Sequence, residues 1–177
     1  DKLTYTITNA LGVDTHKGNV AIQVTADGVN PADDDISYIV QAIHPTSGAL
    51  VDSVDIEVGE TLTVQVSVQD GRPVVASDAG IFAAYLDLVY GRDNLQMVTD
   101  SLTFGASFPN GQSGNLSVPG LVDEAGAFQD LSVVNGSAPL TVFTVDFRGL
   151  NPGITTVQSD PADVSSDSPV PGTSPLH

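Results

Sequence analysis

Carboxylates are the side chains of this sequence best suited to chemistry, and their densest group falls in the segment DGVNPADDD (27–35). Within these nine residues lie Asp27, Asn30, Asp33 and Asp35. Calcium takes about six to eight hard oxygen ligands, which acidic loops of this kind supply. The spacing is not that of an EF-hand, because the Gly is displaced and no Glu closes the loop. The segment is therefore either a calcium site or a solvated acidic turn.

A second group of carboxylates lies near the end of the chain. Asp160 and Asp163 occur in SDPAD, and Asp167 follows shortly after. The same two interpretations apply to this group, a calcium site or a solvated turn. Calcium is the only cofactor that the sequence suggests.

Residues for hydrolytic catalysis are poorly placed. The histidines His16, His44 and His177 fall in turn, linker and tail contexts, away from any Ser and acid at a strand end. Glycoside hydrolysis needs two acids about 5 to 10 Å apart in a ring-lined cleft. Asp123 and Glu124 are adjacent in sequence, which points them in different directions, and the chain has no Trp. We expect no enzymatic activity.

The charge balance limits the partners. Asp and Glu number 22 against five Lys and Arg, giving a formal net charge of -17. Such a surface repels nucleic acid and anionic lipid, and favours cations, a saline medium or a basic partner. No apolar run approaches the length that spans a bilayer, so we expect no membrane insertion. With no Cys and many Thr, Ser and Gly residues, the composition is typical of bacterial extracellular or cell-surface proteins.

The elements that must position these groups are strands. In 61–68, Leu62, Val64, Val66 and Val68 fall on one face, and Thr, Gln and Ser fall on the other. Similar runs, separated by turn residues, predict strands at 50–57, 61–69, 80–90, 94–104, 114–119, 128–134, 140–148 and 154–158. This spacing predicts an all-β fold, a jelly-roll-like antiparallel β-sandwich of about nine strands.

The chain divides into three parts by pattern. Residues 1–45 form a partial β-unit with strand candidates at 3–8, 19–25 and 36–43, either the end of a cadherin- or Ig-like repeat or an N-terminal extension that docks on the sandwich. Residues 46–163 form the sandwich. The segment 164–177 is rich in Pro and Ser and is expected to be a tail or linker.

The pieces VGETLTVQVSVQD, AGIFAAYLDLVYGRDNLQMV, NGQSGNLSV and LTVFTVDFRGLNPGITTV occur in this order between about 51 and 163. In order and spacing they resemble the cohesin modules of bacterial multi-domain proteins. That resemblance implies a β-sandwich that binds a dockerin module in a calcium-dependent way, without catalysis. A structural spacer or adhesin domain stabilised by calcium and a carbohydrate-binding module of similar fold are the alternatives.

The resemblance also implies a binding surface on the outward faces of two strands. It places Tyr85, Asp87, Asp146 and Arg148 on the dockerin platform, on the sheet that contains strand 80–90. Alternation puts Phe82 on the core side of that strand. A cohesin ends with a strand that returns beside the first one, whereas here the Pro-rich tail follows. We expect the N-terminal segment to fill that position.

Overall fold

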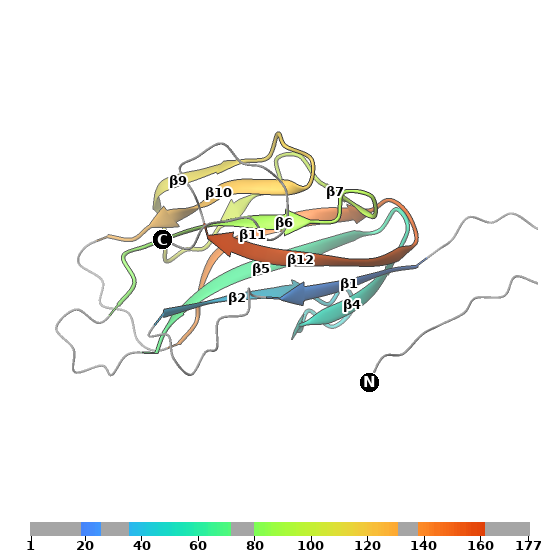
Figure 1. The fold of residues 1–177 in the computed structure, drawn as a ribbon. Helices are drawn as coiled ribbons and strands as arrows, with labels where there is room; N and C mark the ends of the chain where they lie inside the picture. The colour runs from blue at the N-terminus through green and yellow to red at the C-terminus, as the bar shows by residue number, and fades with distance from the viewer. Residues whose placement is uncertain (1–18, 26–35, 72–79, 131–137, 162–177) are drawn as a thin grey trace, which may run out of the picture.

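The computed structural model describes residues 19–25, 36–71, 80–130 and 138–161, and within these ranges every regular element is a strand. Twelve strands form two sheets that pack face to face (Figure 1). Sheet A has the order β4 (Ser53–Glu57), β1 (Asn19–Thr25), β12 (Gly153–Pro161), β6 (Ala83–Tyr90), β10 (Leu121–Phe128), β9 (Asn110–Asn115). Sheet B has the order β3 (Leu50–Val51), β2 (Ile36–Ile43), β5 (Thr61–Asp70), β11 (Leu140–Gly149), β7 (Leu95–Met97), with β8 (Thr103–Phe104) also on β11. The predicted all-β sandwich is confirmed.

The core lies between the sheets and is built from the alternating rows that the sequence predicts. Sheet B contributes one buried row from β5 (Leu62, Val64, Val66, Val68) and one from β11 (Phe143, Val145, Phe147). Sheet A contributes the buried row of β6 (Ala84, Leu86, Leu88, Tyr90). Each large apolar side chain removed from water contributes about 1.5–3 kcal/mol. Alternation therefore fixes which face of each strand is left for binding.

A tyrosine joins the sheets where one strand ends. The last register pair of β12 with β6 is Pro161 with Leu86. Just beyond it, Tyr38 of β2 donates its hydroxyl hydrogen to the backbone oxygen of Tyr85, 3.1 Å away. Burial raises the pKa of the Tyr38 hydroxyl, and the hydrogen bond to the Tyr85 carbonyl offsets part of this rise. The neutral phenol thus acts as a cross-sheet tie.

The N-terminal strands belong to this sandwich. β1 lies between β4 and β12 in sheet A, and β2 pairs with β5 along its whole length in sheet B. Strands from both sides of the boundary predicted at residue 45 are therefore paired in both sheets. The pair β1–β12 is parallel, while the other pairs among the described strands are antiparallel.

Four predicted strands differ from the structure. The strand predicted at 50–57 is divided into β3 and β4, which lie in different sheets, and the strand predicted at 94–104 is divided into β7 and β8. The structure has β9 at 110–115 where we predicted a loop followed by a strand at 114–119, and β10 at 121–128 where we predicted one at 128–134. β9 is exposed at every position and has no apolar alternation. The alternation of β10 is interrupted by a bulge between Val122 and Ala125. The candidate at 3–8 and the tail lie outside the described residues.

Candidate functional site

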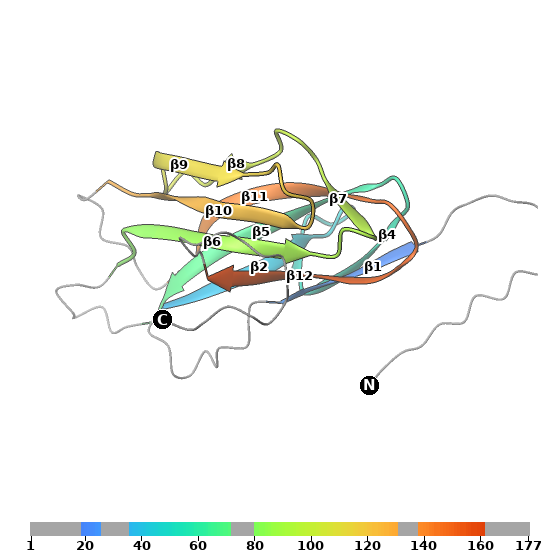
Figure 2. The same ribbon diagram turned by 45° about the horizontal axis from the view of Figure 1, so that its top comes forward.

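An aromatic cluster covers part of the outer face of sheet A, which Figure 2 shows as β12, β6, β10 and β9 side by side. The cluster consists of Phe82, Tyr85 and Phe128, which we call the aromatic patch. The rings of Phe82 and Phe128 lie 5.5 Å apart between centroids, at an interplanar angle of 36°. Phe82 is 49% exposed, and Tyr85 and Phe128 are half-buried. Three rings thus reach solvent on one face of the sheet.

The rings of Tyr85 and Phe128 pack against glycines on β10 and β9. Gly126 of β10 lies opposite Tyr85 in the register, and a Cβ there would come within 2.6 Å of the Tyr85 ring. A Cβ on Gly111 of β9 would lie 2.0 Å from the Phe128 ring. Gly111 also has φ of +56°, which favours glycine. The Tyr85 hydroxyl donates to the Gly111 carbonyl at 2.7 Å. Both rings therefore lie against bare backbone and are held in place.

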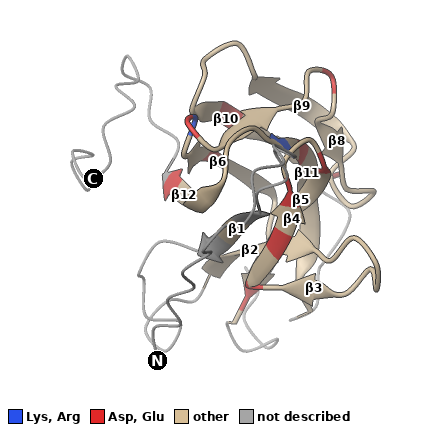
Figure 3. Ribbon diagram, turned by 90° about the vertical axis from the view of Figure 1, so that its right-hand side faces the viewer, with Lys and Arg blue, Asp and Glu red and all other residues tan. Residues whose placement is uncertain are grey.

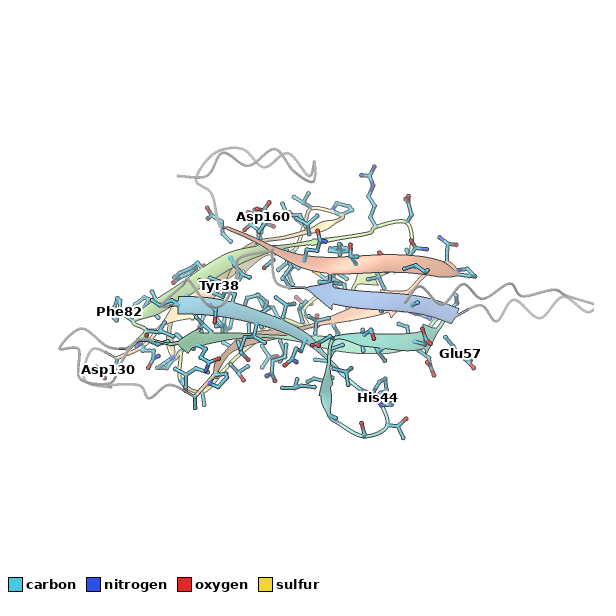
Figure 4. All side chains as sticks on the ribbon, turned by 60° about the horizontal axis from the view of Figure 1, so that its bottom comes forward. Tyr38, His44, Glu57, Phe82, Asp130 and Asp160 are labelled. Atoms are coloured by element: carbon cyan, nitrogen blue, oxygen red, sulfur yellow. The ribbon has the colours of Figure 1, made fainter. Side chains whose placement is uncertain are left out.

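The position of Phe82 corrects the sequence prediction. Strict alternation places this side chain in the core with Ala84 and Leu86. In the structure Phe82 precedes the first residue of β6, and it lies on the surface at one end of the sandwich, as Figure 4 shows. The adjacent Ile81 is buried in its place. The alternation fails because the backbone is not yet a strand at this residue.

Asp87 lies on the same outer face but is not an exposed contact residue. Its side chain is only 5% exposed, and its Oδ1 accepts a hydrogen bond from the backbone N–H of Glu124 at 2.7 Å. Glu124 sits in the bulge of β10 with φ of +46°. A carboxylate that accepts a backbone N–H at such a kink stabilises it. We therefore assign Asp87 to holding the bulge that shapes this face.

The structure brings Asp87 next to Asp160, two residues that the sequence analysis assigned to different roles. They are register partners across the antiparallel pair β6–β12. Side chains directly opposite in such a pair have Cβ atoms about 4.5–5.5 Å apart. Figure 4 shows Asp160 near the end of β12. The register therefore places two acidic side chains side by side next to the aromatic patch.

Asp146 and Arg148 lie on the other sheet, so the four predicted platform residues do not share a surface. Both residues are on β11 in sheet B, whereas Tyr85 and Asp87 are on β6 in sheet A. Asp146 accepts a hydrogen bond from the Thr63 hydroxyl at 2.6 Å, and Arg148 donates through Nε to the Gly59 carbonyl at 3.1 Å. Outward faces of the two sheets point in opposite directions. The prediction of one platform containing all four is therefore wrong.

The predicted calcium ligands are only partly within the described structure. Asp27, Asn30, Asp33, Asp35 and Asp163 lie outside the described residues, and Asp160 has the place given above. Within the described ranges, no three acidic or His side chains converge as a metal group. Nor do these ranges contain a helix long and apolar enough to cross a membrane.

Charge over the described surface is strongly one-sided. Arg92 and Arg148 are the only Lys or Arg in the described ranges, and Figure 3 shows Asp and Glu on strands of both sheets. A surface of this sign accelerates association with positively charged partners, and the effect falls as salt rises. The aromatic patch is thus an apolar area within an acidic surface.

The aromatic patch as a unit was not predicted from the sequence. Phe82 and Phe128 are far apart in sequence, and Gly111 and Gly126 have the residue type of turns rather than of a sheet surface. The patch could be recognised from aromatic residues that lie opposite glycines on paired strands. Recognising it in this way requires the register of β6, β10 and β9, which the sequence does not give. No model of a known protein family matches this chain, and no characterised protein matches its sequence significantly.

Proposed function

We propose that the outer face of sheet A, centred on the aromatic patch, is a non-catalytic binding surface for a partner protein. The observation that carries the proposal is the seating of Tyr85 and Phe128 on glycine backbone, with the exposed Phe82 ring beside that of Phe128. Aromatic side chains dominate the energetics of protein interfaces because they bury a large area with few rotatable bonds. Rings already held in place lose little further entropy on binding.

The partner that fits this face has an apolar centre and a basic rim. Asp123 of β10 and Asp160 of β12 flank the patch in sheet A, and both are half-buried rather than hidden. Opposite charge around an apolar centre gives specificity and a faster association rate. The cohesin-like resemblance suggests a dockerin-type module as the partner, and a bacterial extracellular or cell-surface setting in which calcium is available.

The test is affinity capture with the immobilised chain from a secreted fraction, in calcium and in chelator, followed by titration calorimetry with the captured module. The deciding variants are Phe82→Ala in the aromatic patch and Arg148→Ala on the outer face of sheet B. Truncation of an aromatic side chain at the centre of an interface typically reduces the binding free energy by about 2 kcal/mol or more, which raises Kd about 30-fold. We expect Phe82→Ala to weaken binding by at least about this factor, and Arg148→Ala to leave it unchanged.

Two results contradict the proposal. If Arg148→Ala weakens binding and Phe82→Ala does not, the partner binds sheet B. If neither the wild type nor the variants retain a partner at low salt, the domain is better described as a structural spacer. Circular dichroism of each variant is the control for folding, and the exposed position of Phe82 predicts that its truncation leaves the spectrum unchanged.

Polysaccharide binding is the second candidate, and the exposure of three rings on one face favours it. Sugar rings stack on flat aromatic faces, so Phe82 and Phe128 at 5.5 Å would offer adjacent stacking positions. Affinity electrophoresis against a panel of soluble polysaccharides separates the two candidates. Retardation that disappears in Phe82→Ala, without capture of a protein, supports sugar binding.

A further inference from the structure

Each fixed ring of the aromatic patch has one side left for a ligand. Tyr85 packs against Gly126 and donates its hydroxyl hydrogen to the Gly111 carbonyl, and Phe128 packs against Gly111. The side of these rings that touches the sheet is therefore closed, and a ligand meets the opposite side. Phe82, at the end of the sandwich in Figure 4, is 49% exposed. The face of an aromatic ring carries partial negative charge, so such a surface attracts cations as well as apolar groups.

Two of the rings are close enough to share one cation. The ring centroids of Phe82 and Phe128 lie 5.5 Å apart, with an angle of 36° between the ring planes. A cation is attracted to a ring when it lies within about 6 Å of the centroid. A single group placed above the pair meets this condition for both rings. The pair thus offers two aromatic faces to one positive charge.

The charge around the patch has the sign that favours a cation. The Glu124 side chain is exposed, and its backbone N–H donates to Asp87, which lies two residues from Tyr85 on β6. Two residues of a strand span about 7 Å, which is shorter than the Debye length of about 8 Å at physiological ionic strength. The chain as a whole has a formal net charge of -17. A positive group is therefore attracted both by the ring faces and by the surrounding charge.

The described residues supply no cation of their own to these rings. Arg92 and Arg148 are the only Lys or Arg in the ranges that the structure describes. Arg92 follows the end of β6 that is far from Phe82, and Arg148 lies on β11 in the other sheet. A positive group at the patch therefore has to come from a partner, as far as the described ranges are concerned.

We propose that the aromatic patch binds an arginine side chain of the partner protein, with the guanidinium stacked over the rings of Phe82 and Phe128. This inference rests on the proposed function, because it identifies the chemistry of the partner residue that contacts the same patch. Guanidinium is planar, stacks on aromatic faces and is more weakly hydrated than the ammonium group of lysine. Its aliphatic stem packs on apolar surface while the charge remains near solvent. Arginine thus matches both the rings and the acidic surroundings.

A nuclear magnetic resonance titration tests the inference without the partner protein. The probe is N-acetyl-arginine methylamide, which has one positive charge and no carboxylate. Protons that lie over an aromatic ring are shifted upfield by its ring current, so the δ-methylene protons of the probe report stacking. We expect an upfield shift on addition of the chain, and changes in the amide signals of β6 and β10 but not of β4. The corresponding citrulline derivative lacks the charge and the lysine derivative lacks the planar group, so both should shift less.

Two matched variants separate the rings from the general charge. Phe82→Leu keeps an apolar side chain but removes an aromatic face, and should raise the Kd of the arginine probe about two- to fivefold, as expected for an exposed cation–ring contact. Leu50→Ala is the control, because Leu50 is 44% exposed and lies on β3 in the other sheet. It should leave the Kd unchanged.

Three results would overturn the inference. Equal shifts for the arginine and citrulline probes would show that the charge has no part in binding, and equal shifts for arginine and lysine would exclude the choice of guanidinium. Unchanged arginine binding by Phe82→Leu would show that the acidic side chains act without the rings. The proposed function is judged separately: if the chain captures a partner that Phe82→Ala loses, while the arginine probe shows no shift, the binding surface stands and its anchor is an apolar side chain.

Discussion

The close packing of Tyr85 against Gly126 predicts that Gly126→Ala destabilises the fold. The new Cβ would lie 2.1 Å from the backbone oxygen of Ala84 and 2.6 Å from Cα of Tyr85. Carbon and oxygen meet at about 3.3 Å, so β6 and β10 must separate locally by about 1 Å. This exceeds the range of an N–H···O bond, and the loss of one or two ladder bonds costs about 1 kcal/mol each. Overpacking adds about 1–3 kcal/mol.

We therefore expect Gly126→Ala to lower the free energy of unfolding by about 2–5 kcal/mol. The assay is equilibrium urea denaturation followed by far-ultraviolet circular dichroism, since the chain has no Trp to report by fluorescence. Gly114→Ala in β9 is the matched control. Its Cβ would meet the end of the Leu102 side chain at 2.7 Å, which can move, and Cβ and Cα of Ala125 at 3.2 and 3.3 Å, which need to shift by only a few tenths of an ångström. This control should cost less than about 1 kcal/mol.

The reasoning is refuted if Gly126→Ala unfolds within about 0.5 kcal/mol of the wild type, the range of an ordinary surface substitution. It is also refuted if Gly114→Ala costs as much as Gly126→Ala. In that case the absence of a side chain, and not the close approach of backbone to ring, would explain both glycines.

Substitutions at three further positions test other features of the fold. Burial raises the pKa of the Tyr38 hydroxyl in the folded state, so as pH rises the unfolded chain loses this proton first. The contribution of the neutral hydroxyl to folding stability is therefore complete below the usual tyrosine pKa of 10.0, and it is lost as pH rises through the folded-state pKa. Tyr38→Phe should therefore show a shallower alkaline decline in urea-unfolding free energy than the wild type, and an equal slope would contradict this. Phe147→Ala removes a fully buried ring whose centroid lies 4.9 Å from that of Tyr90, and should cost about 3–5 kcal/mol in the same assay. Glu124 has φ of +46°, a backbone conformation that glycine adopts without strain. Glu124→Gly should therefore leave the free energy of unfolding unchanged or raise it by up to about 1 kcal/mol, whereas Glu124→Val should lower it. The reverse order would exclude backbone strain at this position.

The alternation of apolar and polar residues in the sequence predicts most of the strands and their buried faces. The rows of β5 and β11 alternate strictly, and the sequence places Val64, Val66, Phe143 and Phe147 in the core, where the structure has them. The sequence does not locate β9, because NGQSGN is a polar edge strand whose residues are all exposed. A strand of this kind is held by its pairing with β10 and not by an apolar face of its own.

The candidate site is less accessible to prediction because it depends on pairing across the chain. Tyr85 is correctly placed on an outward face by alternation, but only the register of β10 and β9 shows that Gly126 and Gly111 lie beneath the rings. Likewise, alternation orients Asp146 outward from β11 but does not tell which sheet contains β11. Which face a residue is on is a local property, whereas which residues share that face is not.

The parallel pair β1–β12 has a mechanical consequence. Its register runs from Val20 with Gly153 to Thr25 with Gln158, so β1 begins at one end of the sandwich and β12 ends at the other. Tension applied to the chain before β1 and after β12 would pull these neighbours past each other along their length. All of their hydrogen bonds would then bear the load together instead of opening one by one. Stretching single molecules through these two points should therefore require much greater force than peeling β9 from β10, an antiparallel pair at the edge of sheet A.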